Sequence, residues 1–125
     1  MTGKVLILVV DDEVDACQFV ASLLESAGYT VACCTGGREA LRYVVRNKPD
    51  LLISDVRMPE MDGLQLAAEV KRLEPNVRVI LYSACGDWPM LCEALGKGCD
   101  DLLPKPCPNE EILRTVGRVL ERAVV

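Results

Sequence analysis

The sequence contains no histidine, and only 4% of its 125 residues are aromatic. A core with so few rings must be built mainly from Val, Leu, Ile and Ala. Because histidine is absent and none of the seven cysteines forms a C-x-x-C pair, the usual ligand clusters of a zinc site are missing. We therefore interpret the cysteines as mostly small buried hydrophobes and expect a reducing, cytoplasmic location.

Positive charge is also scarce, since 14 Lys and Arg stand against 19 Asp and Glu, for a net charge of −5. Direct nucleic-acid binding normally needs a basic footprint, so this balance argues against it. The basic row Arg114, Arg118 and Arg122 is interpreted as a solvated helix face. Long apolar runs are missing too. The run Val5–Val10 is followed directly by three acidic residues, so it is too short for the apolar part of a signal peptide or for a membrane span.

Short apolar runs alternate with longer amphipathic segments along the chain. Val5–Val10, Leu51–Ile53 and Val77–Leu81 are continuous apolar runs, which are typical of strands buried on both faces. Thr30–Thr35 and Leu102–Leu103 are weaker strand candidates. Such a pattern predicts βαβ units with right-handed crossovers and a parallel sheet with helices on both faces.

Five apolar stripes at helical spacing lie between or after these runs, and Gly28 is suited to end the first. The stripes are Cys17, Val20, Ala21 and Leu24; Leu41, Val44 and Val45; Leu66, Val70 and Leu73; Leu91, Ala94 and Leu95; and Ile112, Val116, Val119, Leu120 and Ala123. We find no repeat or linker, and the length fits one domain with one core.

The polar residues at the ends of the predicted strands form the candidate site, because ligands of open parallel sheets bind outside the carboxyl ends of the strands. The first strand ends in Asp11 and Asp12, the third in Asp55, the fourth in Ser83 and the fifth in Lys105. Each residue alone is more often a helix cap or a solvated loop residue. The five residues together, each at a strand end, favour a functional site at this edge of the sheet.

This set of side chains favours phosphoryl chemistry. Neighbouring carboxylates repel one another, and a cation relieves the raised pKa that the repulsion imposes. Oxygen ligands without histidine favour a hard ion, and a few carboxylates with waters suit Mg²⁺. A carboxylate beside Mg²⁺ is able to attack a phosphoryl group, while Lys105 and Ser83 each offer a donor to one phosphoryl oxygen.

Four segments resemble the response regulator receiver domains (CheY-like) of two-component signal transduction. They are Val-Asp-Asp-Glu at 10–13, Asp-Val-Arg-Met-Pro-Glu-Met-Asp-Gly at 55–63, Ser-Ala at 83–84 and Lys-Pro at 105–106. The resemblance covers essentially the whole chain, so we expect a single receiver domain at 1–125. It implies an α/β, doubly wound, flavodoxin-like (βα)5 fold with a parallel five-stranded sheet of order 2-1-3-4-5.

The resemblance also implies a role for each acidic residue of the candidate site. Asp55 would be the phosphorylated residue. Mg²⁺ would be bound by Asp12 and Asp55, by Asp11 through water, and by the backbone carbonyl of Arg57. The phosphoryl group would come from a sensor histidine kinase or a histidine phosphotransfer protein, and the changed surface would control a protein target or an output domain.

Five other positions match the family pattern. Ser83 and Lys105 stand where members contact the phosphoryl group, and the bond between Lys105 and Pro106 matches one that is often cis. Pro59 and Gly63 match the turn after the phosphorylated residue, where a glycine is able to take a positive φ.

Leu102 departs from the family pattern, because members usually carry Tyr or Phe three residues before the lysine. A leucine lacks the ring that swings inward on activation and should prefer burial throughout. We therefore expect phosphorylation to change the surface of the fourth predicted helix and the fifth strand less than in a typical member. The alternative function is that of an intermediate phosphorelay carrier with little conformational output.

Other functional classes fit less well. A phosphatase of the haloacid dehalogenase type also uses an Asp nucleophile and Mg²⁺, but it needs a second Asp where this chain has Arg57. A flavin carrier would place its phosphate loop at the acidic residues 11–13, which would repel phosphate. A pseudo-receiver would lack some of the five site residues. We expect a signalling module, not an enzyme beyond its own phosphorylation and slow dephosphorylation.

Overall fold

The computed structural model describes residues 4–84, 93 and 98–122. In chain order its elements are β1 (Leu6–Val10), α1 (Val14–Ser26), β2 (Thr30–Cys34), α2 (Gly37–Asn47), β3 (Leu51–Asp55), α3 (Gly63–Leu73), β4 (Arg78–Ala84), β5 (Asp101–Lys105) and α5 (Asn109–Arg122). The stripe predicted as a fourth helix (Leu91, Ala94 and Leu95) lies outside the described residues. No helix within the described part of the chain is long and apolar enough to cross a membrane.

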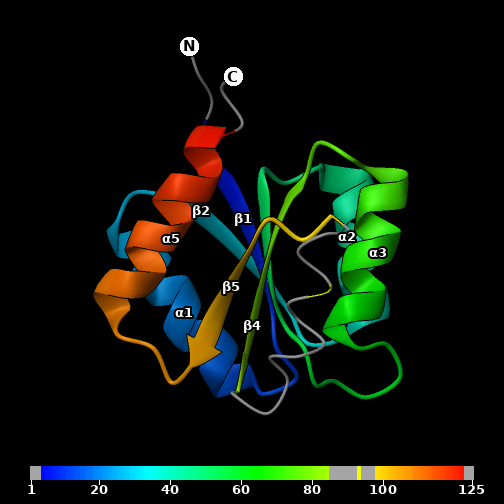
Figure 1. Cartoon of the computed structure of the whole chain (residues 1–125), viewed down its shortest axis with the longest axis horizontal. Coiled ribbons are helices and arrows are strands. Elements are labelled where there is room, and N and C mark those ends of the chain that lie inside the picture. Colours follow the sequence, from blue (N-terminus) through cyan, green and yellow to red (C-terminus); the bar gives the residue numbers. More distant parts are fainter. Residues whose placement is uncertain (1–3, 85–92, 94–97, 123–125) are drawn as a thin grey trace.

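The five strands form one parallel sheet of order β2-β1-β3-β4-β5, as predicted. Helices α1 and α5 cover one face of this sheet and α2 and α3 cover the other, so the molecule has three layers (Figure 1). The sheet order reverses between β1 and β3, and such a reversal opens a crevice at the carboxyl ends of the two strands.

Side chains of the central strands alternate between the two layers of helices. Leu8 and Val10 of β1 pack toward α2 and α3, whereas Ile7 and Val9 pack toward α1 and α5. Both faces of the strand are therefore buried, which explains its unbroken apolar run. The weaker strand candidates are β2 and β5, the two edge strands. Edge strands need less apolar sequence, and β5 also accommodates Pro104 there.

The predicted helix stripes are buried on α1 but only in part elsewhere. On α2 the buried positions are Gly37, Ala40 and Val44. Val45 follows Val44 by one residue and so points about 100° away on the helix, which leaves it 45% exposed. Leu73, in the last turn of α3, is 38% exposed. The sequence prediction was wrong for these two residues.

Other predictions for the helices agree better with the structure. Gly28 follows the C-cap of α1 with a φ of 99°, in the left-handed region that glycine tolerates. On α5, Ile112, Val116 and Val119 are buried and Leu120 is half-buried, whereas Ala123 lies outside the described residues.

The cysteines of the described residues divide by position. Cys17, Cys34 and Cys99 are buried. Burial raises the pKa of all three thiols, to about 11 for Cys34 and Cys99. Cys33 is exposed and Cys107 is half-buried. The interpretation as buried hydrophobes therefore holds for three of these five residues, because a thiol with so high a pKa stays protonated and inert.

Candidate functional site

The carboxyl ends of β1, β3 and β5 bring Asp11, Asp55 and Lys105 together. The Lys105 ammonium lies 3.1 Å from Asp11 Oδ2 and 3.3 Å from Asp55 Oδ2. Lys105 and Asp11 are 94 residues apart in the chain, so the parallel sheet creates the contact. The sequence predicted that these three side chains would lie at one edge of the sheet, and in the structure they do.

Asp12 completes a carboxylate cluster with Asp11 and Asp55, whose ligand oxygens all lie within 4.8 Å of one another. Asp11 is 3% exposed, and its Oδ1 accepts a hydrogen bond from the backbone N–H of Glu13 at 2.9 Å. Asp12 is exposed and Asp55 is half-buried. Clustered hard oxygens with surplus negative charge fit a small divalent cation such as Mg²⁺.

Burial and neighbouring charges shift the pKa of Asp55 and of Lys105. Burial raises the pKa of the Asp55 carboxyl; the Lys105 charge opposes the shift and the Asp11 charge adds to it. For Lys105, burial alone would lower the pKa, but the hydrogen bond to Asp11 and the charges of Asp55 and Asp11 raise it overall. An added cation beside Asp55 would favour its ionised form.

The loop after Asp55 depends on Gly63 for a reason that the sequence prediction missed. A Cβ on Gly63 would collide with the Asp55 carbonyl oxygen and lie 2.9 Å from Val56 Cα. The positive φ in this loop, 69°, belongs instead to Glu60. Glycine is therefore required at 63 for close backbone approach, and the expectation of a positive φ at this position was wrong.

Helix α3 starts directly behind this loop and holds it in place. The Gly63 N–H donates to the Val56 carbonyl at 2.8 Å. The Asp62 carboxylate accepts from the Gln65 N–H at 2.8 Å, and the Gln65 side chain accepts from the Asp62 N–H at 3.0 Å. This capping box satisfies two backbone donors that the helix would otherwise leave unpaired.

The remaining predicted residues lie at the same edge. Arg57 is exposed in the loop after Asp55. Ser83, near the end of β4, is buried and lies opposite Pro104 of β5, next to Lys105. The peptide bond between Lys105 and Pro106 is cis, as the resemblance implied.

Tyr82 contributes to the site although the sequence did not single it out. The Lys105 ammonium lies 4.9 Å from the centroid of the Tyr82 ring, within cation–π distance. The ring is half-buried against the core under α1 and α5, and Tyr82 lies opposite Asp55 in the sheet. Only the pairing of β4 with both β3 and β5 places this ring under the lysine.

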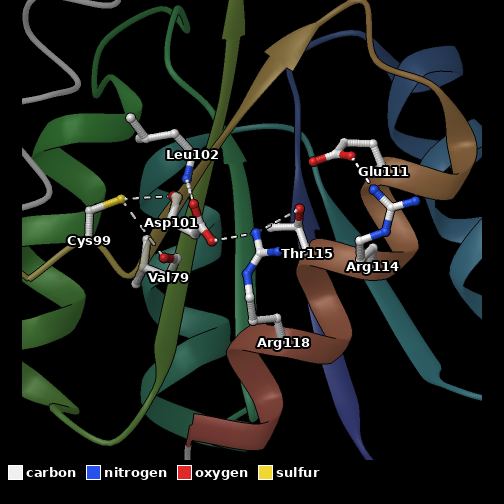
Figure 2. Close-up of polar contacts among 8 residues, drawn as sticks. All are labelled: Val79, Cys99, Asp101, Leu102, Glu111, Arg114, Thr115 and Arg118. Carbon is white, nitrogen blue, oxygen red and sulfur yellow. Dashed lines mark hydrogen bonds and ion pairs between the residues drawn. The ribbon is translucent and has the colours of Figure 1, made fainter.

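Leu102 is half-buried and packs against the core under α2 and α3. Figure 2 shows its side chain on the side of β5 away from the Asp101–Arg118 contact. Arg118 Nη2 lies 3.1 Å from Asp101 Oδ2 and 3.4 Å from the Thr115 hydroxyl. The Leu102 N–H donates to Asp101 Oδ1 at 2.8 Å. The residue thus lies between the core and an ionic contact that joins β5 to α5.

Comparison with known proteins supports these observations. The family model of the response regulator receiver domain matches residues 7–117. The transcriptional regulatory protein GlrR of Escherichia coli (strain K12) is 37% identical over 117 residues, which are 94% of this chain and 26% of GlrR. The chemotaxis protein CheY of Thermotoga maritima is 33% identical over 114 residues, which are 90% of this chain and 95% of CheY.

Solved structures give the same result. A response regulator receiver domain protein from Clostridium thermocellum has a TM-score of 0.91 at 29% identity, with 94% of this chain and 95% of that chain covered. NtrX from Brucella abortus also has a TM-score of 0.91 at 29% identity, over 97% of this chain and 28% of NtrX. The chain spans about a quarter of the length of the curated transcriptional regulators that it matches. The chain belongs to the response regulator receiver domain family of two-component systems, whose members are signalling proteins rather than enzymes in the usual sense.

Proposed function

We propose that this domain accepts a phosphoryl group on Asp55 from a sensor histidine kinase or a histidine phosphotransfer protein. The changed surface then controls a protein target or an output domain. One observation carries the proposal: three carboxylates lie within 4.8 Å of one another, and the Lys105 ammonium lies 3.3 Å from Asp55. Such a cluster combines a nucleophile, a place for a cation and a fixed positive charge.

Asp55 is the best nucleophile of the three carboxylates. Asp11 is buried, with Oδ1 bonded to the Glu13 N–H and Oδ2 to Lys105. Asp12 is exposed and is not among the carboxylates that pair with Lys105 in the described residues. Asp55 alone is both partly accessible and in contact with the ammonium that would receive a phosphoryl oxygen.

The transfer of the phosphoryl group needs no oxidant, reductant or other co-reactant. An Asp55 oxygen forms a bond to phosphorus as the nitrogen–phosphorus bond of the donor histidine breaks, and that nitrogen keeps the electron pair. Lys105 moves from the Asp55 carboxylate to one phosphoryl oxygen, and the Ser83 hydroxyl donates to another. Mg²⁺, held by Asp12, Asp55 and the Arg57 carbonyl and by Asp11 through water, would offset the charge of the entering oxygens.

We also infer that residues 1–125 act as one receiver unit that catalyses only its own phosphorylation and slow hydrolysis. The buried, unpaired thiols support a reducing, cytoplasmic setting. Leu102 favours a second candidate, an intermediate phosphorelay carrier. Its half-buried aliphatic side chain offers no ring that could change position on phosphorylation.

The test is incubation with phosphoramidate and Mg²⁺, followed by mass spectrometry of the intact chain. We expect one added phosphoryl group that is lost on treatment with hydroxylamine, as an acyl phosphate would be. Asp55→Asn should abolish the adduct. Asp15→Asn, which alters an exposed carboxylate in the first turn of α1, should leave it unchanged. A full adduct on the Asp55→Asn variant would contradict the assignment.

A further inference from the structure

An open groove with an apolar floor runs between α2 and α3, with a volume of about 590 Å³. Leu41, Val45, Met61 and Leu73 form its floor. Val45 and Leu73 are among the four large hydrophobic side chains that are exposed in the described part of the chain. Leu41 and Met61 pack against the core beneath them, so the floor is an extension of that core to the surface. Exposed apolar surface of this kind is typical of an interaction site.

The rim of the groove is basic. Arg38, Arg42 and Arg46 recur every four residues on α2 and therefore lie along one side of the helix, over about 12 Å. Arg38 lies 4.0 Å from Glu60, but both side chains are largely exposed and such a pair is weak. Arg42 and Arg46 form no ion pair with any other described residue. Two guanidinium groups without an ion pair among the described residues, and a third in a weak pair, thus line an apolar floor in a chain of net charge −5.

We propose that this groove binds an acidic amphipathic helix of a partner protein. Aliphatic side chains of that helix would cover Val45 and Leu73, and carboxylates one turn apart would meet the arginines. Guanidinium groups bind carboxylates in a two-pronged geometry, and a helix laid in a groove presents side chains at the same four-residue spacing as the rim. An anionic membrane is a poorer fit, because membrane-bound helices insert a projecting apolar face and this one is recessed.

One end of the groove touches the loop after Asp55. Met61 belongs to this loop and packs closely against the start of α2, where a Cβ on Gly37 would lie only 2.8 Å from Met61 Cβ. A change in the loop that shifts Met61 would therefore alter the floor of the groove. On the proposed function, phosphorylation of Asp55 would alter the affinity of the groove; the docking itself does not depend on it.

The test uses two dye-labelled synthetic peptides of about 18 residues, long enough to sample helix in water. Both carry leucines at helical spacing, one flanked by glutamates and the other by lysines. Fluorescence anisotropy with the whole chain should show binding of the glutamate peptide only. The double variant Arg42→Glu/Arg46→Glu should weaken it by about tenfold or more and should gain the lysine peptide. The control is Arg114→Glu on α5, which should leave both affinities unchanged.

Several results would overturn the docking proposal. One is equal binding of the two peptides. Another is unchanged binding by the Arg42→Glu/Arg46→Glu variant when urea unfolding shows that this variant is folded. A third is binding to anionic vesicles and to neither peptide. A stable dimer that the glutamate peptide does not dissociate would assign the groove to a second copy. Asp55→Asn should bind the glutamate peptide like the wild type. A wild-type chain that takes up no phosphoryl group would therefore contradict only the proposed function. Peptide binding that does not depend on the charge of the peptide would contradict only the docking proposal.

Discussion

Two ionic clusters lie at opposite ends of the sheet and are balanced in opposite ways. At the carboxyl ends of the strands, Lys105 is the cation that contacts Asp11 and Asp55, with Asp12 close by. At the amino ends of β4 and β5, Asp100 contacts two cations, Lys71 at 3.0 Å and Arg78 at 3.9 Å. The first cluster has surplus carboxylates and the second has surplus cations.

The amino-end cluster also satisfies its groups through the backbone. Asp100 accepts from the Val79 N–H at 2.7 Å, and the Asp100 N–H donates to the Val79 carbonyl at 2.8 Å. Lys71 donates to the Val77 carbonyl at 2.6 Å. This arrangement ties α3 to β4 and to the start of β5. The comparison teaches that charges bound to opposite charges and to backbone groups stabilise a fold, whereas surplus carboxylates are kept where a cation is needed.

Breaking the amino-end cluster should have the largest effect on stability. Asp100→Ala should lower the free energy of unfolding by about 2–4 kcal/mol, because it leaves the largely buried Lys71 without its carboxylate partner and removes the acceptor of the Val79 N–H. Urea unfolding measures the change. The control Glu69→Ala breaks the exposed Glu69–Arg72 pair on the same helix and should have no measurable effect. A loss as small as in the control would contradict the structural role.

Removing a carboxylate from the other cluster should have the opposite effect on the fold. Asp12→Ala should raise stability in the absence of divalent ions, since it relieves repulsion with Asp11 and Asp55. It should weaken Mg²⁺ binding by roughly tenfold or more, because affinity follows the number of charged ligands. Mg²⁺ titration followed by thermal unfolding reports both effects. A variant that is less stable but binds Mg²⁺ normally would show that Asp12 is structural.

Asp55, in the carboxyl-end cluster, should make the stability of the fold depend on pH. Because the folded state raises its pKa, the ionised Asp55 destabilises the fold, and this cost disappears below the ordinary aspartate pKa of about 3.9. Asp55→Asn should therefore be more stable than the wild type at neutral pH with a chelator present. The difference should shrink as the pH falls through the range between the raised pKa and the ordinary value. A stability difference independent of pH would refute this account.

A smaller effect is expected at the ring under Lys105. Tyr82→Leu removes a cation–π contact worth about 0.5–1 kcal/mol, which would slow phosphorylation by roughly two- to fivefold. The matched variant Tyr82→Phe keeps the ring and should react at the wild-type rate. The measurement is the rate of phosphoryl uptake from phosphoramidate. Equal rates for the leucine and phenylalanine variants would mean that the ring does not position the lysine.

The smallest change should occur at Leu102, on the strand that joins the two clusters. Because its side chain is already packed against the core, beryllofluoride, which mimics the phosphoryl group, should shift the amide resonances of residues 100–104 little. The shifts should be centred on residues 55–60, beside Asp55, and on residues 83–90, of which 85–90 lie outside the described residues. Large shifts at 100–104 would show that β5 switches without an aromatic ring, and would remove the support for a carrier with little output.

Much of the architecture was predictable from local patterns. The apolar runs of β1, β3 and β4 were visible because strands buried on both faces leave no polar gaps. The polar residues at the ends of the first, third and fifth predicted strands then indicated the place of Asp11, Asp55 and Lys105, since parallel strands share a carboxyl edge. The segment at 55–63 was specific enough to indicate the family before any coordinates.

Other contacts between distant segments, and the burial of each side chain, were decided by the tertiary structure alone. The sequence places Asp11 and Asp12 side by side, but only the packed sheet buries one and exposes the other. It likewise takes the pairing of β4 with its neighbours to bring Tyr82 under Lys105. The groove beside Val45 follows from how α2 lies against α3. Sequence periodicity determines which residues can share a face, whereas strand order, register and helix packing decide what each face meets.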